Sequence, residues 1–397
     1  MTNRIYYTDP SCRTFAATVT RAFDQDGRPA VTLDRTAFYP ASGGQPFDTG
    51  RLGAAGVVDA MDAEGDVIHV LSAPLAAGLA VTGEIDWVRR FDHMQQHTGQ
   101  HVLSAAFDRL FENGTVGFHM GADVSTIDLA REAAPSEVER AVDEANRIVW
   151  EDRPVSIRFV SPAEAASLLL RKEPAREGTL RLIDISGFDL SACGGTHVER
   201  TGAIGLIAAL STERLRGGSR LTFACGGRAL RALRAYRDAV AGSVRVLSVL
   251  PRDLPVAVER VQAESKDLRK LIKDLQERLA AHEGARLVAD APQVGGVRLL
   301  VRSVDGWDAA GLKTLAAAAA GTAGACVVLM SGVPPVSLVV ARSAGVPVDA
   351  NVVVQQLTSR FGGRGGGKPE LAQGGGLAAP VEEIAAAARA LLESALA

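Results

Sequence analysis

The stretch DHMQQHTGQHVLSAAFDRLF (residues 92–111) predicts a helix that carries a metal site. Its apolar residues from Val102 to Leu110 recur at helical spacing, and Gly114 stands near the expected end. His97 and His101 are four residues apart, so on a helix their rings project from one face about one turn apart. Two imidazoles placed in this way can hold one metal ion. Alone, the spacing fits two half-exposed polar residues equally well.

A second pair of candidate ligands stands about a hundred residues further along, in CGGTH (193–197). The two glycines let the backbone turn, so that the thiolate of Cys193 and the imidazole of His197 can converge. A mixed set of His and Cys ligands favours zinc over magnesium or calcium, while iron stays possible. We therefore expect one zinc ion per chain, bound by His97, His101, Cys193 and His197. Four protein ligands ordinarily make a closed site, so catalysis would need an exchangeable position.

Other polar residues surround this predicted site. His93 precedes His97 by one helical turn and is interpreted as a polar surface residue, with a supporting role at the metal as the alternative. His119, in GTVGFHMG (114–121), is a candidate for positioning water or substrate, although a structural histidine fits equally well. The loop FYPASGGQP (38–46) offers backbone N–H groups with Ser42 and Gln45 for a polar ligand, and a plain turn is the alternative.

The chain reads as an α+β protein with four parts. Residues 1–90 contain short β-branched or alternating runs between turns, which indicates a small β-barrel. Residues 91–235 combine the helix beginning at Asp92 with a helix at 135–150, strand-like runs and a helix at 162–171, and they form the zinc-containing α+β domain.

Residues 236–283 are predicted to be helical, and residues 284–397 to form a separate α/β domain. Apolar residues repeat at alternating spacings of four and three over 252–283, which is typical of a coiled coil. An intramolecular helical hairpin and a homodimer both fit that pattern. The last part ends in a glycine-dense loop, GGRGGGKPELAQGGG (362–376), where Arg360, Arg364 and Lys368 add positive charge that could hold an RNA backbone.

Composition limits the cellular setting. The 397 residues are 47% hydrophobic, which predicts well-filled cores, and the net charge is only −3. The N-terminus has no apolar run and no apolar stretch is long enough to span a membrane, so we expect neither export nor membrane insertion. Four scattered cysteines do not make a disulfide framework, which favours the reducing cytoplasm.

Several motifs together resemble a known family. The segments TAFYPASGGQPFDTG (36–50), HTGQH (97–101) and CGGTHVERTGAIG (193–205) are similar to the AlaX family of alanyl-tRNA editing proteins and to the editing half of alanyl-tRNA synthetase. RGGSRLTFACGGRAL (216–230) resembles the end of that editing domain. The 252–283 helix and GRGGGKPELAQGGG (363–376) resemble the synthetases' C-terminal domain. We expect no aminoacylation core before the barrel, so the resemblance is to a long, free-standing AlaX that would edit in trans.

The resemblance implies a substrate and a reaction. The substrate would be Ser-tRNA(Ala), with Gly-tRNA(Ala) as a second candidate, and its ester would be hydrolysed to free amino acid and intact tRNA. A second hydrolytic site is needed because an alanine pocket rejects serine and glycine only weakly. Zinc could polarise the ester, activate water or anchor the amino acid, and four protein ligands favour anchoring. Catalytic candidates are His119, Gln45, Thr36 and Thr196, the two threonines being expected to read the serine hydroxyl.

Two other functions compete with this one. A tRNA-binding accessory protein would carry the same residues around a purely structural zinc. A zinc hydrolase of a small ester or amide would act without tRNA. Both alternatives use the same four ligands, so the ligand spacing does not distinguish them.

Overall fold

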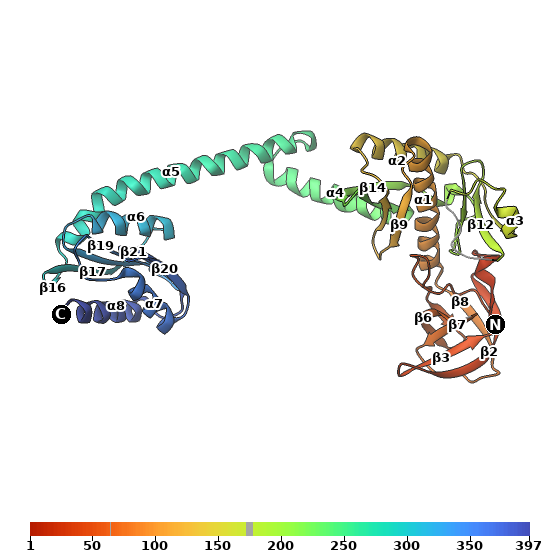
Figure 1. Ribbon diagram of the computed structural model, residues 1–397, viewed down its shortest axis with the longest axis horizontal. Coiled ribbons are helices and arrows are strands. Elements are labelled where there is room, and N and C mark those ends of the chain that lie inside the picture. Colours follow the sequence, from red (N-terminus) through yellow and green to blue (C-terminus); the bar gives the residue numbers. More distant parts are fainter. Residues whose placement is uncertain (64, 172–177) are drawn as a thin grey trace. The chain divides into compact units, whose positions relative to one another are not determined.

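The computed structural model describes residues 1–63, 65–171 and 178–397. The chain divides into two compact units, Met1–Gly242 and Ser243–Ala397. Helices and sheets occur in both units, which confirms the predicted α+β class (Figure 1). None of the described helices combines the length and apolar character that a membrane crossing requires.

Six antiparallel strands near the N-terminus close into a barrel in the order β2-β3-β7-β6-β5-β8. The strands are β2 (Thr14–Gln25), β3 (Arg28–Leu33), β5 (Gly50–Leu52), β6 (Ala55–Ala63), β7 (Asp66–Leu71) and β8 (Ala80–Ile85). Strand alternation turns Phe15, Ala17 and Val19 of β2 into the barrel core. Beside the barrel, β1 (Asn3–Arg4) pairs in parallel with β4 (Arg35–Thr36), and the 3-10 helix η1 (Ile5–Tyr7) follows β1.

The helix predicted from Asp92 is α1 (Trp87–Phe111), which begins five residues earlier than expected. Its start is fixed by Asp86, whose side chain accepts a hydrogen bond from the N–H of Arg89. One turn in, the fully buried Arg90 reaches the barrel. Its Nε lies 3.1 and 3.0 Å from the carboxylate oxygens of Asp48, and one Nη donates to the carbonyl of Pro10. This buried pair ties α1 to the barrel, and both lie in one unit.

Two sheets and a second helix surround α1. The four-stranded sheet has the order β14-β15-β10-β9, the three-stranded sheet the order β11-β12-β13, and α2 (Pro135–Trp150) forms at the predicted 135–150. Their strands are β9 (Thr115–Met120), β10 (Ser125–Leu129), β11 (Val155–Val160), β12 (Leu180–Ile185), β13 (Asp189–Ala192), β14 (Ile207–Leu215) and β15 (Gly218–Cys225). The 3-10 helix η2 (Thr201–Ile204) precedes β14. α1 thus has neighbours on several sides, and its residues from His93 to Phe107 are buried.

The helix predicted at 162–171 is wrong beyond its first turn, because α3 spans only Pro162–Ala165. The hydroxyl of Ser167 donates to the carbonyl of Glu164, which competes with continuation of the helix. Further along, the backbone N–H of Arg171 pairs with the carbonyl of Leu190 on β13. After Ala165 the backbone therefore leaves the helix, and at Arg171 it hydrogen-bonds to the sheet.

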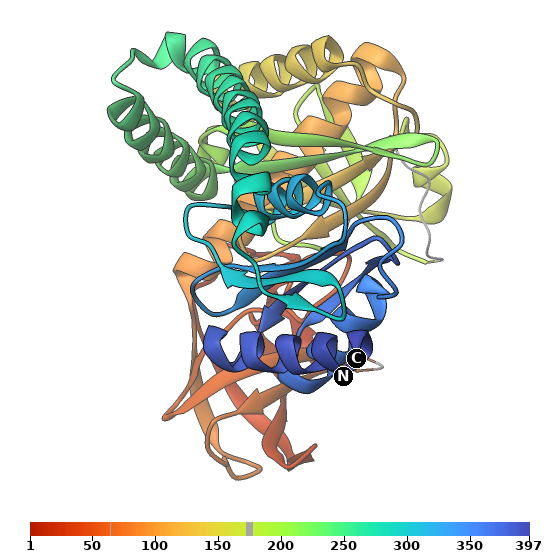
Figure 2. The ribbon, with the colours of Figure 1, turned by 90° about the vertical axis from the view of Figure 1, so that its left-hand side faces the viewer.

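The second unit is a six-stranded sheet between two layers of helices. The strand order is β16-β17-β18-β19-β21-β20, parallel only between β17 and β18. The helices α7 and α8 cover one face and α6 covers the other (Figures 1 and 2). The elements are β16 (Gln293–Val294), β17 (Val297–Ser303), α6 (Ala309–Ala320), β18 (Ala325–Met330), β19 (Val336–Arg342), α7 (Ala350–Phe361), β20 (Arg364–Lys368), β21 (Leu371–Leu377) and α8 (Val381–Leu396).

The glycine-dense segment is a β-hairpin, not the predicted loop. Its strands β20 and β21 pair antiparallel at one edge of the sheet. A Cβ on Gly365 or Gly374 would crowd the side chain of Val354 on α7, so the glycines let this helix approach the hairpin. Close packing, rather than flexibility, accounts for these two glycines.

Two long helices cover the predicted coiled-coil region. They are α4 (Gly226–Leu247) and α5 (Leu254–Ala289), with the 3-10 helix η3 (Pro251–Asp253) between them. The end of α5 packs on α6, where a Cβ on Gly284 would meet the backbone of Ala319 at 2.8 Å. Between Val258 and Leu279 the large apolar residues of the repeat stay exposed, from 42% at Val258 to 59% at Leu268. The hairpin and the homodimer both stay predictions.

Candidate metal centre

The four predicted metal ligands lie together. Their ligand atoms are all within 4.8 Å of one another, and three of the four side chains are buried. Nε2 of His97 lies 3.4 Å from Sγ of Cys193, and Nε2 of His197 lies 3.3 Å from the same sulfur. The buried core of α1 presents the first two ligands, and the turn after β13 brings the other two against them. The four residues can therefore hold a single metal ion.

Each imidazole is oriented by a hydrogen bond at its other ring nitrogen. Nδ1 of His97 lies 2.8 Å from Oε1 of Gln45, and Nδ1 of His101 lies 3.0 Å from the carboxylate of Asp189. Nδ1 of His197 lies 3.2 Å from the hydroxyl of Thr98. The amide oxygen and the carboxylate only accept, so they fix a proton on Nδ1 and leave the Nε2 lone pair for a metal.

In the turn that carries Cys193 and His197, only Gly195 has no space for a side chain. A Cβ on Gly195 would collide with the ring of His97 and crowd Oε1 of Gln45. At Gly194, by contrast, the nearest atoms would be those of Tyr7 at 3.9 Å, an ordinary contact. The second glycine of CGGTH is thus set by the close approach of the α1 histidine, not only by the turn.

The electrostatics of the cluster favour a thiolate. Burial acts to raise the pKa of Cys193, but the neighbouring imidazoles of His97 and His197 outweigh it and hold the pKa well below its usual value. Burial acts to lower the pKa of His101, but its hydrogen bonds to Asp189 and Cys193 raise it to about 9. Burial lowers the pKa of His197 to about 3.

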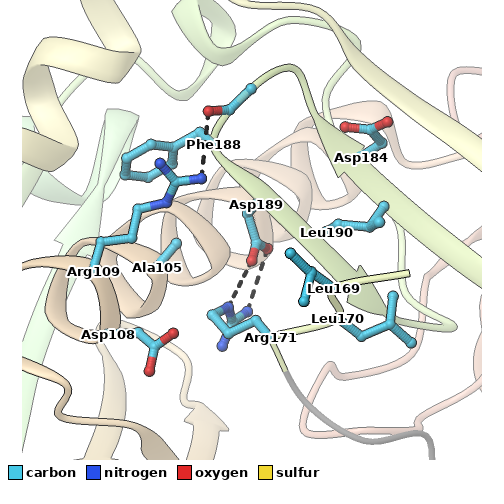
Figure 3. Close-up of a pocket in the computed structure, with 11 residues that line it drawn as sticks. Ala105, Asp108, Arg109, Leu169, Leu170, Arg171, Asp184, Phe188, Asp189 and Leu190 are labelled. Carbon is cyan, nitrogen blue, oxygen red and sulfur yellow. Dashed lines mark hydrogen bonds and ion pairs between the residues drawn. The ribbon is translucent and has the colours of Figure 1, made fainter. Parts of the chain in front are cut away.

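Behind His101, Asp189 is the centre of a buried polar network. The carboxylate is fully buried and accepts hydrogen bonds from Nε of Arg171 at 2.6 Å and from the hydroxyl of Ser191 at 2.9 and 3.0 Å. Figure 3 shows Arg171 and Asp189 facing each other at a cavity of about 410 Å³ that Phe188 and Arg109 also line. Asp189 thereby holds the ring of His101 from the side away from the sulfur.

An open recess adjoins the cluster. It has a volume of about 570 Å³, and His97, Cys193 and Gly195 form part of its wall. Tyr6, Ser42 and Arg181 are among the residues that line the rest. A ligand that enters this recess therefore meets the metal-binding residues directly.

Two of the predicted catalytic residues support the ligands and do not line the recess. Gln45 is buried; it donates from Nε2 to the hydroxyl of Thr196 at 2.8 Å and accepts from the N–H of Thr196 at 3.1 Å. Gln45 therefore joins the barrel loop to the CGGTH turn and holds His97 between them. Both residues therefore contact the surroundings of His97 and not the space of the recess.

The other two predicted catalytic residues lie apart from the cluster. The hydroxyl of Thr36 is buried and lies 2.8 Å from Nε2 of His69, while it accepts from the N–H of Phe38. His119 is exposed on β9, because its neighbour Phe118 turns toward His97, with ring centroids 5.4 Å apart. The structure brings neither side chain to the metal ligands.

The predicted RNA-binding residues are in the second unit. Arg360 ends α7, Arg364 begins β20 and Lys368 ends it, and all three are exposed. Their binding role stays a prediction.

Sequence reasoning missed the residues that hold the imidazoles from behind. Asp189, Ser191 and Cys193 alternate along DLSAC (189–193), a period of two that places them on one face of a strand. That spacing could have identified Asp189. Thr98 directly follows a predicted ligand, and its hydroxyl also accepts from the N–H of Val198. Nothing in the sequence pattern sets Thr98 apart.

Comparisons with known proteins find two family models and several relatives. The family model described as the threonyl and alanyl tRNA synthetase second additional domain matches residues 180–221, and the DHHA1 domain model matches residues 296–394. Alanine–tRNA ligases of Natronomonas pharaonis and Methanosarcina mazei are 37% and 33% identical over 94% of this chain. The chain spans 42% of the length of each ligase.

A relative of similar length is the alanyl-tRNA editing protein AlaX-L of Pyrococcus horikoshii. It is 30% identical, and the alignment covers 96% of both chains. Among solved structures, the C-Ala domain of alanyl-tRNA synthetase from Aquifex aeolicus matches 26% of this chain at 26% identity, with a TM-score of 0.24. The match to AlaX-L over nearly its whole length, together with the two domain models, shows that this chain belongs to the AlaX family of alanyl-tRNA editing proteins.

Proposed function

We propose that this chain is a zinc-dependent aminoacyl-tRNA deacylase that hydrolyses mischarged Ser-tRNA(Ala), with Gly-tRNA(Ala) as a second candidate substrate. One observation carries the proposal: two of the four converging ligands, His97 and Cys193, form part of the wall of an open recess. A metal held only for stability needs no such access. Membership in a family whose relatives are named for alanyl-tRNA editing supplies the substrate class.

The donor set fits zinc. Three imidazole nitrogens and one thiolate are the mixed set that zinc accepts in tetrahedral sites, and hard cations such as magnesium avoid it. When bound, zinc would supply a Lewis acid at the recess, which could polarise the ester or anchor the amino-acid portion. We favour anchoring because His97, His101, Cys193 and His197 already supply four ligands. One zinc ion per chain follows from the single cluster found among the described residues.

The chain's own residues bind and orient the substrate. Gln45, Asp189 and Thr98 fix the three imidazoles, so the ligand cluster beside the recess is held in place, and His97 presents its ring to the substrate. Thr196 acts through Gln45. Because the hydroxyls of Thr36 and Thr196 are already engaged, direct reading of the serine hydroxyl by either would require a change of hydrogen-bond partner.

We propose that tRNA(Ala) is the partner of the second unit and that the enzyme works in the cytoplasm, where charged tRNA is used. Arg360, Arg364 and Lys368 supply exposed positive charge at one end of α7 and along the edge strand β20. The exposed apolar repeat of α5 suits a homodimer through residues 252–283.

The alternative is a tRNA-binding accessory protein with a purely structural zinc. The completeness of the four-ligand set favours this alternative, since catalytic zinc sites commonly keep a position open.

A deacylation assay separates the two functions. The zinc-loaded chain is incubated with Ser-tRNA(Ala), Gly-tRNA(Ala) and Ala-tRNA(Ala), and release of amino acid is followed. The proposal predicts hydrolysis of Ser-tRNA(Ala) far above the spontaneous rate, with Ala-tRNA(Ala) spared. Binding of tRNA without release of serine would establish the accessory protein instead. Hydrolysis of small seryl esters at the same rate as Ser-tRNA(Ala) would indicate the hydrolase that needs no tRNA.

A further inference from the structure

The recess beside the metal ligands contains a buried guanidinium that forms no ion pair with a carboxylate of the described residues, and the anionic group that acts on it is the thiolate of Cys193. Arg181 on β12 is 9% exposed. It donates from Nε to the carbonyl of Tyr7 at 2.9 Å and from one Nη to the carbonyl of Cys193 at 2.6 Å. Its other nitrogen, Nη2, is buried and has no hydrogen-bond partner, and no carboxylate in the described part of the chain forms an ion pair with it.

A second polar atom at the same recess is also unsatisfied. The side chain of Tyr6 is fully buried, and its hydroxyl makes no hydrogen bond of normal geometry within the described residues, although the charge of the nearby Arg4 acts on it. Its ring packs edge-on against Tyr7 and Tyr39, with centroids 4.9 and 5.3 Å apart. Burial raises the pKa of Tyr6 well above its usual value, so the hydroxyl keeps its proton and can donate.

Arg4 provides a contrast within the same recess. Its two terminal nitrogens lie 3.0 and 2.6 Å from the carboxylate of Asp62, so its charge is balanced. Unpaired buried polar groups destabilise a fold, and few persist without a reason. Two of them, Arg181 and Tyr6, line one recess with His97 and Cys193. A ligand that carries more than one anionic oxygen supplies an acceptor for each of them.

We propose that Nη2 of Arg181 and the hydroxyl of Tyr6 bind the phosphodiester that joins the terminal adenosine of the substrate tRNA to the preceding nucleotide. This assignment rests on the proposed function. A buried cation that is unpaired before the reaction calls for a permanent anion. The α-ammonium group of the amino acid has the wrong charge, and the ester carbonyl is neutral before attack. The phosphodiester is the permanent anion nearest to the terminal ester.

The test uses an analogue in which the 3′ ester of seryl-adenosine is replaced by an amide, made with and without a 5′-phosphate. Its affinity for the zinc-loaded full chain is measured by titration calorimetry. The wild type should bind the 5′-phosphorylated form about 10- to 100-fold more tightly, the range expected for hydrogen bonds to a charged group. Absence of any gain from the 5′-phosphate would overturn the proposal.

Two variants locate the contact. Tyr6→Phe removes only the unpaired hydroxyl, so it should reduce the gain from the phosphate about tenfold without lowering the thermal midpoint. Arg181→Lys should also reduce the gain, because the ammonium cannot reproduce the guanidinium geometry. Tyr6→Phe should leave the affinity for the unphosphorylated analogue unchanged, whereas Arg181→Lys also loses hydrogen bonds to the carbonyls of Tyr7 and Cys193, so only its phosphate gain is compared. If Arg181→Lys fails to fold, the test rests on Tyr6→Phe. An unchanged gain in affinity from the 5′-phosphate in Tyr6→Phe would refute the proposed contact.

Matched controls distinguish this contact from other causes. Arg147→Gln removes an exposed guanidinium that pairs with Glu144 at 2.6 Å, and it should keep the full gain. Inorganic phosphate alone should compete only weakly. Competition as strong as that of the 5′-phosphorylated analogue would mean a free-anion site and would overturn the substrate assignment.

The binding assay needs no hydrolysis. A chain that shows the phosphate gain but releases no serine would refute the proposed function alone. Deacylation without the gain would refute only this contact.

Discussion

Replacing Gln45 by alanine should weaken metal binding, although Gln45 is not itself a ligand. The side chain makes three hydrogen bonds, one to Nδ1 of His97 at 2.8 Å and two to Thr196 at 2.8 and 3.1 Å. Alanine would leave the ring of His97 without its acceptor. Loss of such an outer partner lowers metal affinity by about 10- to 100-fold, which corresponds to about 1.4–2.7 kcal/mol. The buried N–H of Thr196 would also lose its partner, so the metal-free fold should lose a further ~1–3 kcal/mol.

The assay is competition for zinc against a chromophoric chelator, together with thermal unfolding of the metal-free chain. Gln96→Ala is the matched control. Gln96 is fully buried on α1 and exchanges two hydrogen bonds, of 2.8 and 3.0 Å, with the backbone of Cys225. It should lose similar stability but keep the wild-type zinc affinity. Equal zinc affinities in the wild type and Gln45→Ala would refute the positioning role, and so would an equal loss in both variants.

Three further predictions concern the barrel, the turn and pH. Arg90→Ala should cost about 3–5 kcal/mol in the free energy of unfolding, because it strands the buried carboxylate of Asp48; denaturant titration measures the loss, and a change below 1 kcal/mol would contradict it. Gly195→Ala should reduce zinc affinity at least tenfold, and Gly194→Ala should retain it, because only a Cβ on Gly195 meets the His97 ring. Equal zinc affinities of the two variants would refute this. Burial lowers the pKa of His69 to about 4, so the folded state favours the neutral ring. Its contribution is present above the unfolded pKa of about 6.5 and is lost as the pH falls toward 4. Between pH 7.5 and 5 the free energy of unfolding of the wild type should fall by about 2 kcal/mol more than that of His69→Gln, as measured by thermal unfolding. Parallel pH profiles of the two proteins would contradict this.

The sequence predicted the elements whose pattern is local. α2 forms at the predicted 135–150, because Pro135 at its start and an amphipathic period define it without help from the rest of the chain. The four ligands could be predicted because each pair sits in a short motif with its own geometric requirement. The start of α1 was missed because the cap at Asp86 lies before the apolar period begins.

Features that depend on distant contacts could not be predicted. Gln45 and His97, which share a hydrogen bond, are 52 residues apart in the sequence, and Arg181 and Tyr7 are 174 residues apart. His119 was predicted at the site but lies on the exposed face of β9. The packing of Phe118 against His97 sets which face of β9 points toward α1, and strand alternation then turns His119 away. The glycine-dense segment was predicted as a loop because its composition reflects packing against α7, which no local pattern records.

The central claim is that one zinc ion sits among three histidines and one cysteine at the wall of the recess. X-ray absorption at the zinc edge, combined with elemental analysis of the full chain, tests it most directly. We expect one zinc per chain, one sulfur neighbour at about 2.3 Å and nitrogen neighbours at about 2.0–2.1 Å, with the sulfur lost in Cys193→Ser. A substoichiometric metal content, or a zinc shell without sulfur in the wild type, would contradict the site.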